Sequence, residues 1–361
     1  MHERITHLRA ALAERELPAL LVSAPANRRY LSGFTGSYGW LLVTPSAALL
    51  FTDSRYMLRV AREAPAFTLR QVSHEHPFPK LLLAAVTELG LTQIAFESAH
   101  VTVAEHRGLV KALKKKATLA PVENVVEPLR EIKDADELTT LRRAIALTDA
   151  AFSAVVARLT PTTTERQAAW MLELAMRVGG ADALAFPSIV AAGPNGAQPH
   201  ASPSDEPLGS GRPIIIDMGV RLDGYHADMT RTIVLGEPDA RFWAIYTVVA
   251  EAHRRVIAGL RPGLPAHEAD ALAREHIAAA GYGEQFGHGL GHGVGLAIHE
   301  GPALRRASPN LGSAPLRAGM VTSVEPGIYI EGWGGVRIED LVLLTEAGCE
   351  VLSQAPKLNH E

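Results

Sequence analysis

The sequence predicts two domains of mixed helix and strand: a small α/β domain followed by a larger α+β domain. The first observation is the length of 361 residues, which exceeds that of most single domains. The second is the alternation of short apolar runs with helical patterns over the first 115 residues, as in an α/β layer. The third is a later part in which helices precede strand-rich segments. We place the boundary near Glu127, with domains at 1–127 and 128–361.

Hydrophobic periodicity places the elements of the first domain. Ile5, Leu8 and Leu12 have helical spacing, and Pro18 ends that helix. The segment 27–37, rich in glycine and small hydroxyl side chains, predicts a loop. The other predictions are strands at 19–22, 40–43, 48–51, 68–72 and 93–97, and helices at 54–64, 78–89 and 103–115. No glycine-rich phosphate-binding motif opens these helices, which argues against a nucleotide site.

Two pairs of helices are predicted in the second domain. Acidic residues from Asp134 onwards favour a helix N-terminus there, and Thr164 is a suitable N-cap for the next helix. The predicted helices cover 134–157, 164–178, 242–258 and 266–280. Because each pair precedes a strand-rich segment, a pattern of two helices and several strands occurs twice, in 134–234 and 242–345.

Composition restricts the possible partners and compartment. The 35 basic residues nearly balance the 39 acidic ones, which argues against nucleic acid or an anionic membrane as a partner. Cys349 is the only cysteine, so no disulfide can form within one chain, as expected in a reducing compartment. The sequence contains neither a signal-peptide pattern at its start nor an apolar run long enough for a membrane span. We expect a soluble cytoplasmic protein.

Two carboxylates in the middle of the chain are candidate metal ligands. Asp217 ends the apolar run 214–216, and Asp228 follows eleven residues later, after the turn sequence Asp223-Gly224. Two adjacent antiparallel strands would bring both carboxylates to one point. Such carboxylates repel each other, and the pKa of one rises steeply unless a cation is bound. By itself, such a pair is more often a solvated turn with a capping residue than a metal site.

The C-terminal third contains further candidate ligands. His292 lies in a glycine-rich segment that ends near His299, and Glu325 and Glu339 each follow a β-branched run in which an unpaired charge would be unfavourable. Several carboxylates with one imidazole suit a pair of divalent ions such as Mn, Co or Zn, whereas structural zinc prefers cysteine and histidine. The sequence therefore predicts two divalent metal ions, with manganese as the first choice and cobalt or zinc as alternatives.

In their order and spacing, these motifs resemble those of the M24 metallopeptidases, which have the pita-bread fold, and among them the Xaa-Pro peptidases, aminopeptidase P and prolidase. The resemblance covers about 135–355 and, more loosely, the first domain. It implies a creatinase-like N-terminal domain and a pita-bread catalytic domain. The metal ligands that it implies are Asp217, Asp228, His292, Glu325 and Glu339.

The resemblance also implies roles for residues beside the metals. His200 and His299 match two histidines of the family, one of which stabilises the oxyanion. Glu325 would accept the proton of the attacking water and return it to the proline nitrogen. Arg337, on the same strand face as Glu339, would hold a ligand carboxylate in a bidentate pair.

The implied function is a dinuclear metal-dependent Xaa-Pro peptidase that acts on proline-containing peptides and forms a homodimer. Prolidases bind the carboxylate of a dipeptide with an arginine, but Ala303 stands at the expected position, with Arg305 and Arg306 shortly after it. We therefore favour aminopeptidase P, which releases the residue before proline, with prolidase as the alternative. A conflicting observation is Asn27, which stands where aminopeptidase P can use an acid.

Three further alternatives receive less support from the sequence. A methionine aminopeptidase would need only a short extension before its catalytic half, whereas about 127 residues precede it here. A metal-free binding module with the pita-bread fold would typically have lost ligands, and all five are present. A creatinase-type amidinohydrolase shares the two-domain layout but not the five-ligand set.

Overall fold

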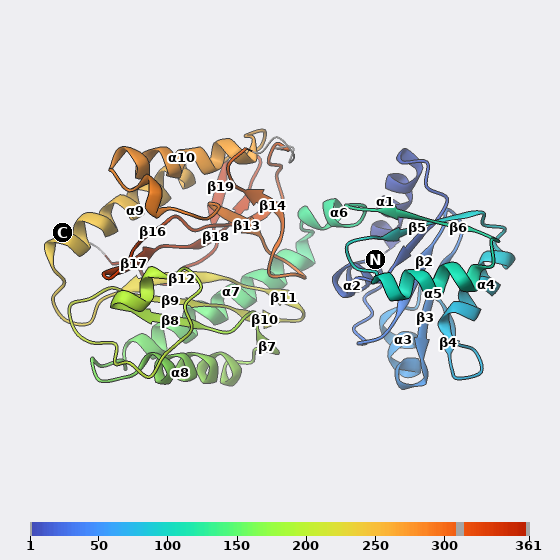
Figure 1. Ribbon diagram of the computed structural model, residues 1–361, viewed down its shortest axis with the longest axis horizontal. Helices are drawn as coiled ribbons and strands as arrows, with labels where there is room; N and C mark the ends of the chain where they lie inside the picture. Colours follow the sequence, from blue (N-terminus) through green and yellow to red (C-terminus); the bar gives the residue numbers. More distant parts are fainter. Residues whose placement is uncertain (1, 308–313, 359–361) are drawn as a thin grey trace. The chain divides into compact units, whose positions relative to one another are not determined.

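The computed structural model describes residues 2–307 and 314–358. The chain divides into two compact units, Met1–Arg130 and Glu131–Glu361, whose helices and strands are labelled in Figure 1. This division lies shortly after the boundary predicted at residue 127, and the last residues of the predicted catalytic domain, 359–361, lie outside the described part. Among the helices of the described residues, none combines the length and apolar character required to cross a bilayer.

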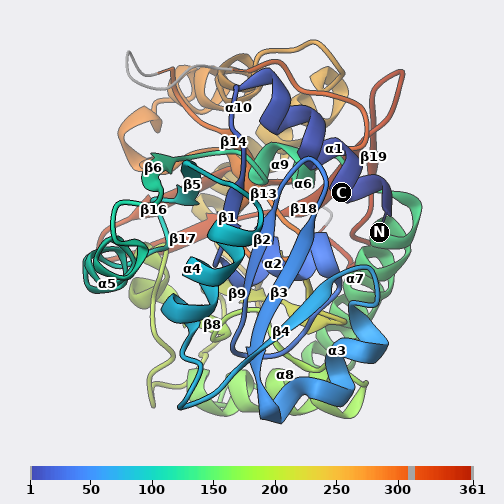
Figure 2. The ribbon, with the colours of Figure 1, turned by 90° about the vertical axis from the view of Figure 1, so that its right-hand side faces the viewer.

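The first unit is built on one six-stranded sheet with the order β4-β3-β2-β1-β5-β6, seen face-on in Figure 2. Parallel pairs at both edges flank the antiparallel β1–β2–β3 centre, and buried apolar side chains fill the core. The strands are β1 (Leu20–Val22), β2 (Trp40–Val43), β3 (Ala48–Asp53), β4 (Thr68–Val72), β5 (Gln93–Glu97) and β6 (Thr118–Val122). The helices are α1 (His2–Glu14), α2 (Pro25–Ser32), η1 (Ser54–Tyr56), α3 (Met57–Glu63), α4 (Phe78–Glu88) and α5 (Val103–Leu113).

The predicted loop at 27–37 is wrong for residues 27–32, which form most of helix α2. The residue before this helix has no side chain that can cap it. Instead, the Glu97 carboxylate on β5 accepts hydrogen bonds from the backbone N–H groups of Ser23 and Ala24, at 2.6 and 2.7 Å. These bonds hold the two residues that lead into the helix, and an acceptor more than seventy residues away leaves no local signal in the sequence. The helix ends as expected, at Gly33 with φ 77°.

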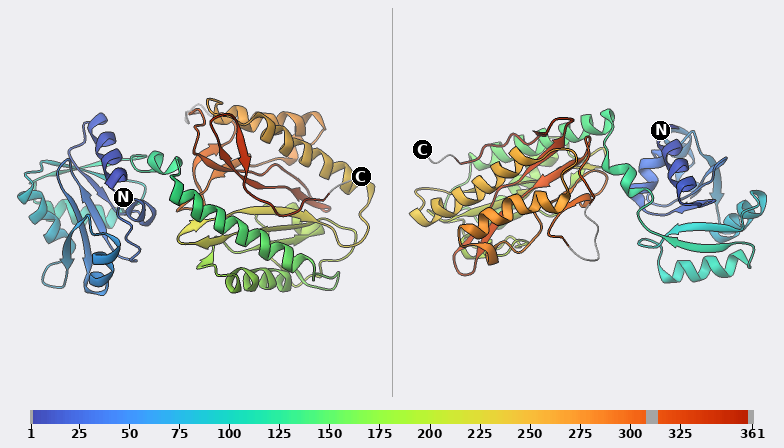
Figure 3. Two further views of the ribbon diagram at one scale, coloured as in Figure 1. Left: turned by 180° about the vertical axis from the view of Figure 1, so that it is seen from behind. Right: turned by 90° about the horizontal axis from the view of Figure 1, so that it is seen from above.

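In the second unit, two helix pairs enclose the strands. Helices α7 and α8 lie on one side of the strands and α9 and α10 on the other (Figure 1, Figure 3). The predicted cap is confirmed: the Thr164 hydroxyl accepts the N–H of Gln167. The helices are α6 (Glu127–Glu131) at the boundary, α7 (Ala135–Val156), α8 (Glu165–Val178), α9 (Ala240–Gly259) and α10 (Ala266–Ala279), with short 3-10 helices η2 (Gly193–Ala197) and η3 (Gly283–Gln285).

The strands of the second unit form sheets of the orders β11-β10-β7, β12-β9-β8, β14-β13-β15-β18-β19 and β16-β17. Those that follow the first helix pair are β7 (Ala183–Leu184), β8 (Ile189–Ala192), β9 (Ile214–Met218), β10 (Val220–Leu222), β11 (Tyr225–His226) and β12 (Met229–Ile233). Those that follow the second pair are β13 (Gly291–Gly293), β14 (Glu300–Leu304), β15 (Val321–Val324), β16 (Gly327–Ile330), β17 (Gly334–Arg337), β18 (Asp340–Leu344) and β19 (Cys349–Val351). The predicted repetition of helices and strands is therefore present.

The turn at Asp223-Gly224 joins different strands from those predicted. It connects β10 to β11, a small hairpin inserted between the two strands that flank the carboxylates. Strands β9 and β12 nevertheless pair in antiparallel fashion, with Thr230 opposite Asp217. Adjacent strands thus still bring Asp217 and Asp228 to one place, although the connection is longer than a tight turn.

Candidate metal centre

A cavity of about 530 Å³ in the second unit contains the predicted site residues. Its apolar walls include Phe186, Ile189 and Ile298, and its polar residues are concentrated at one group of strand ends. The predicted residues that line this cavity are His200, Asp217, Asp228, His292, His299, Glu325, Arg337 and Glu339.

Sheet register places the acidic side chains together. Strand β15 runs directly into Glu325, and Glu339 immediately precedes β18. Because Val324 pairs with Asp340 in the antiparallel ladder, the two glutamates leave neighbouring strands at the same end. The other sheet contributes its aspartates through the β9–β12 pair.

The imidazole of His292 lies among these carboxylates. Its Nε2 atom is 3.6 Å from Asp228 Oδ2 and 3.4 Å from Glu325 Oε1. Its Nδ1 atom is 3.1 Å from the carbonyl oxygen of Gly293, which leaves Nε2 for a ligand. One ligand atom each from Asp228, His292 and Glu339 lie within 4.8 Å of one another, close enough to share an ion.

Burial and mutual repulsion make the ionised carboxylates unfavourable without a cation. Burial, followed by repulsion from Glu339 and Asp217, raises the pKa of Asp228 well above its usual value. Burial, followed by repulsion from Glu325 and Asp217, does the same for Glu339. Burial is also the main reason why the pKa of Glu325 is raised to about 7 and that of His292 is lowered to about 4.

The residues present fit a metal centre. Two buried carboxylate oxygens, Asp217 Oδ1 and Glu339 Oε1, have no hydrogen-bond partner within residues 2–307 and 314–358. Buried acceptors without partners are unfavourable, and a divalent cation would satisfy both oxygens and remove the repulsion between the acids. The donor set, four carboxylates and one imidazole, is of the kind that suits manganese, cobalt or zinc.

Arg337 holds a carboxylate, as predicted, but in a different arrangement. It contacts Asp217 through Nη2 alone, which donates to Oδ2 at 2.6 Å, rather than in the predicted bidentate pair. Its Nε atom donates to the hydroxyl of Thr230 at 3.0 Å, and that hydroxyl donates to Glu339 Oε2 at 2.7 Å. The guanidinium therefore orients one carboxylate directly and another through a threonine.

Sequence reasoning missed three residues that orient this site. Thr230 bridges Arg337 and Glu339, as described above. The Tyr329 hydroxyl accepts from Arg337 Nη1 at 2.8 Å and lies 2.9 Å from Nε2 of His288, a wall residue of the cavity. The Ser323 hydroxyl donates to Glu325 at 3.1 Å. Thr230 and Ser323 are each two residues from a ligand, and this spacing on a strand was the available signal.

The two additional histidines lie at the accessible side of the cavity. The rings of His299 and His292 are 4.4 Å apart between centroids and nearly perpendicular. His200 lies beyond β8, in the segment that follows η2, and its side chain is exposed. Both imidazoles are therefore available to a substrate.

Of the residues considered for substrate length, Arg305 lines the cavity together with Ala303, whereas Arg306 is not among its lining residues. Asn27 belongs to the first unit. It is fully buried and hydrogen-bonded to Glu97, Glu127 and Arg130, so its function there is structural.

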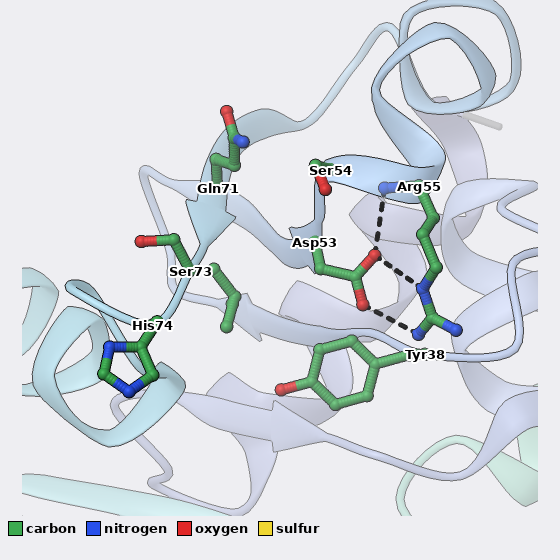
Figure 4. A pocket seen from close by; sticks show the side chains of 8 residues that line it. Tyr38, Asp53, Ser54, Arg55, Gln71, Ser73 and His74 are labelled. Atoms are coloured by element: carbon green, nitrogen blue, oxygen red, sulfur yellow. Dashed lines mark hydrogen bonds and ion pairs between the residues drawn. The ribbon is translucent and has the colours of Figure 1, made fainter.

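A second cavity, of about 510 Å³, lies in the first unit beside β3 and β4 (Figure 4). Its single carboxylate, Asp53, is engaged by Arg55 through both the backbone N–H and the guanidinium. His74 lies at the edge of this cavity and is exposed. This cavity lacks the convergent acids that the metal centre has.

The repeated helix–strand architecture and the acid-rich cavity define a metallopeptidase with the pita-bread fold. The chain belongs to metallopeptidase family M24, whose model matches residues 139–346. The model of the creatinase/prolidase N-terminal domain matches residues 4–132. The predicted family, fold and enzyme class are thereby confirmed, and metal dependence is a property of this family.

Similar proteins cover almost the whole chain. An Xaa-Pro dipeptidase from Pyrococcus horikoshii is 33% identical over 361 residues, with 99% of this chain and 98% of the relative aligned. The structure of an Xaa-Pro dipeptidase from Bacillus anthracis matches with a TM-score of 0.94 and 38% identity, covering 99% of this chain and 98% of that one. The structure of an X-Pro aminopeptidase from Thermotoga maritima matches with a TM-score of 0.88 and 37% identity, covering 96% and 98%.

The raised pKa values predict that metal binding releases protons. Near pH 6 the metal-free site holds protons on its carboxyls, since the pKa of Glu325 is about 7 and those of Asp228 and Glu339 are also raised. The affinity for Mn(II) should therefore rise as the pH increases through 7. Calorimetric titration of metal-free protein at pH 6 and pH 8, in buffers of different ionisation enthalpy, measures both effects. Equal affinity at the two pH values, without proton release, would contradict this electrostatic description.

Proposed function

We propose that the protein is an Xaa-Pro dipeptidase that uses two divalent metal ions, preferably manganese, with cobalt or zinc as alternatives. The observation that carries this proposal is a single cavity that combines the acid cluster with Arg305, whose guanidinium has no partner among the described residues. The Xaa-Pro dipeptidases from two organisms, similar over nearly the whole chain, support it. Homodimer formation and a cytoplasmic location stay predictions from the sequence.

Asp217, Asp228, His292, Glu325 and Glu339 would hold the ions, which supply a water of lowered pKa and polarise the scissile carbonyl. The protein's own groups would do the rest. Glu325 would hold the proton removed from water and deliver it to the proline nitrogen, which must be protonated to leave. His299 would donate a hydrogen bond to the carbonyl oxygen as negative charge develops there.

The guanidinium of Arg305 suits the carboxylate of a dipeptide. An arginine presents several N–H donors in a planar arrangement that matches a carboxylate. In a dipeptide the carboxylate belongs to proline itself, so it enters the same cavity as the scissile bond. Arg305 follows Ala303 by two residues, and side chains two residues apart in an extended segment point to the same side. We propose that Arg305 replaces the arginine expected at position 303.

The proposal reverses the order of the two activities given by the sequence, in which Ala303 favoured aminopeptidase P. An X-Pro aminopeptidase remains the second candidate, supported by the Thermotoga maritima structure. The two candidates differ in whether a residue beyond proline is accepted. Hydrolysis of an Xaa-Pro dipeptide and of the matching Xaa-Pro-Xaa tripeptide by the Mn(II)-loaded protein tests the proposal. A higher kcat/KM for the tripeptide would favour the aminopeptidase.

Arg305→Ala should lower kcat/KM for an Xaa-Pro dipeptide by about 10- to 100-fold, because a charge-assisted bidentate contact is lost. Hydrolysis of the same dipeptide carrying a C-terminal amide should hardly change, since it lacks the carboxylate. Arg306→Ala is the matched control and should retain activity on both. If Arg305→Ala affected the acid and the amide equally, Arg305 would not be the carboxylate anchor.

A further inference from the structure

A buried ion pair outside the metal centre connects two segments of the catalytic unit. Lys133 Nζ lies 3.0 Å from Glu300 Oε1, and the exposed fractions of the two side chains are 0% and 7%. Burying two charges is unfavourable in itself, so such a pair is weak evidence of stabilisation. The position of Glu300, directly after His299, suggests a different purpose for these charges.

Glu300 organises the turn that precedes it. Its Oε2 atom accepts the backbone N–H of Ala297 at 3.2 Å, while Oε1 receives the lysine. A methyl group at Gly295 would overlap the same carboxylate, so a larger residue there would displace Glu300 from this position. The carboxylate therefore lies inside the turn 295–300. His299 belongs to the same turn, and its side chain lines the cavity.

Lys133 is itself fixed to the part of the sheet that supports a metal ligand. Its backbone N–H donates to the Gly319 carbonyl at 2.9 Å, and Ile132 forms a β-bridge with Met320. Met320 directly precedes β15, the strand that leads into Glu325. The lysine thus connects the base of the Glu325 strand to the turn that bears His299.

We propose that the Lys133–Glu300 pair is a positioning device that sets the orientation of the His299 imidazole relative to the metal ligands. The proposal rests on the proposed function, because it assigns His299 to the scissile carbonyl. Neither Lys133 nor Glu300 lines the cavity, so both act through the turn and not on the substrate. A displacement of about 1 Å in a catalytic group is enough to reduce rates by about 100-fold.

The kinetic test compares three variants: Glu300→Gln, Lys133→Met and the double variant. Each single variant leaves one buried charge without its partner and could fail to fold for that reason. The double variant removes both charges and avoids this problem. We expect kcat on an Xaa-Pro dipeptide to fall by roughly 10- to 100-fold in each, with bound metal and KM nearly unchanged. Adding Glu300→Gln to His299→Ala should produce no further loss, since the pair acts through that histidine. Arg142→Met, which breaks the exposed Arg142–Glu350 pair, is the control and should leave kcat unchanged.

A readout independent of catalysis separates this proposal from the proposed function. Side-chain NMR of histidine-labelled protein, metal-free and zinc-loaded, should show altered His299 resonances in Glu300→Gln but not in Arg142→Met. If the wild type fails to cleave Xaa-Pro peptides, the proposed function is wrong, and the NMR comparison still tests the pair. The positioning role would be overturned by any of three results for Glu300→Gln. These are unchanged His299 resonances, loss of metal, or a loss of rate that is equally large in the wild-type and His299→Ala backgrounds.

Discussion

Asp228→Ala is expected to abolish peptidase activity together with metal binding. Asp228 lies with His292 and Glu339 in the group whose ligand atoms are within 4.8 Å of one another. Its removal leaves the shared ion without a carboxylate that balances its charge, while the remaining acids still repel each other. Elemental analysis of the purified variant should therefore find less metal than in the wild type, and activity should fall to the uncatalysed background.

Asp149→Ala is the control for this variant. Asp149 is another buried aspartate of the second unit, and its carboxylate accepts the backbone N–H of Gln354 instead of facing the cavity. Its loss should reduce thermal stability but retain the metal. If Asp228→Ala bound as much metal as the wild type, Asp228 would not be a ligand.

His299→Ala should keep its metal and lose about two to four orders of magnitude in kcat. The imidazole lines the cavity and touches the His292 ring, but it is not part of the carboxylate cluster. It is therefore suited to stabilising charge on the substrate. Single-turnover kinetics together with elemental analysis distinguish this role from metal ligation.

His276→Ala, in α10 on the side shared with α9, is a matched control that removes an imidazole away from the cavity. It should retain full activity. Metal loss in His299→Ala equal to that in Asp228→Ala would make His299 a ligand, and a normal rate would show that it has no part in the reaction.

The sequence predicts most of the fold, because amphipathic periodicity and caps are local properties. Thr164, for example, caps its helix within three residues. The start of α2 escaped prediction, since it has no side-chain cap and the residues before it are held by Glu97, from a distant strand. The same limit applies to the site. Residue types and spacing single out the candidate ligands, whereas the partner of Arg337 depends on how β17 lies against β9. That packing brings Asp217 rather than Glu339 to Nη2.

The convergence of distant strands on one cavity determines when in folding the site can exist. Asp217 and Glu339 are more than a hundred residues apart, and the strands that carry the candidate ligands belong to two different sheets. Contacts this remote form late, because the chain entropy lost in closing long loops opposes them. The complete set of candidate ligands therefore exists only once the catalytic unit has closed, and an ion that needs all of them can bind only then. A metal that binds only this final state adds to its stability and slows its reopening.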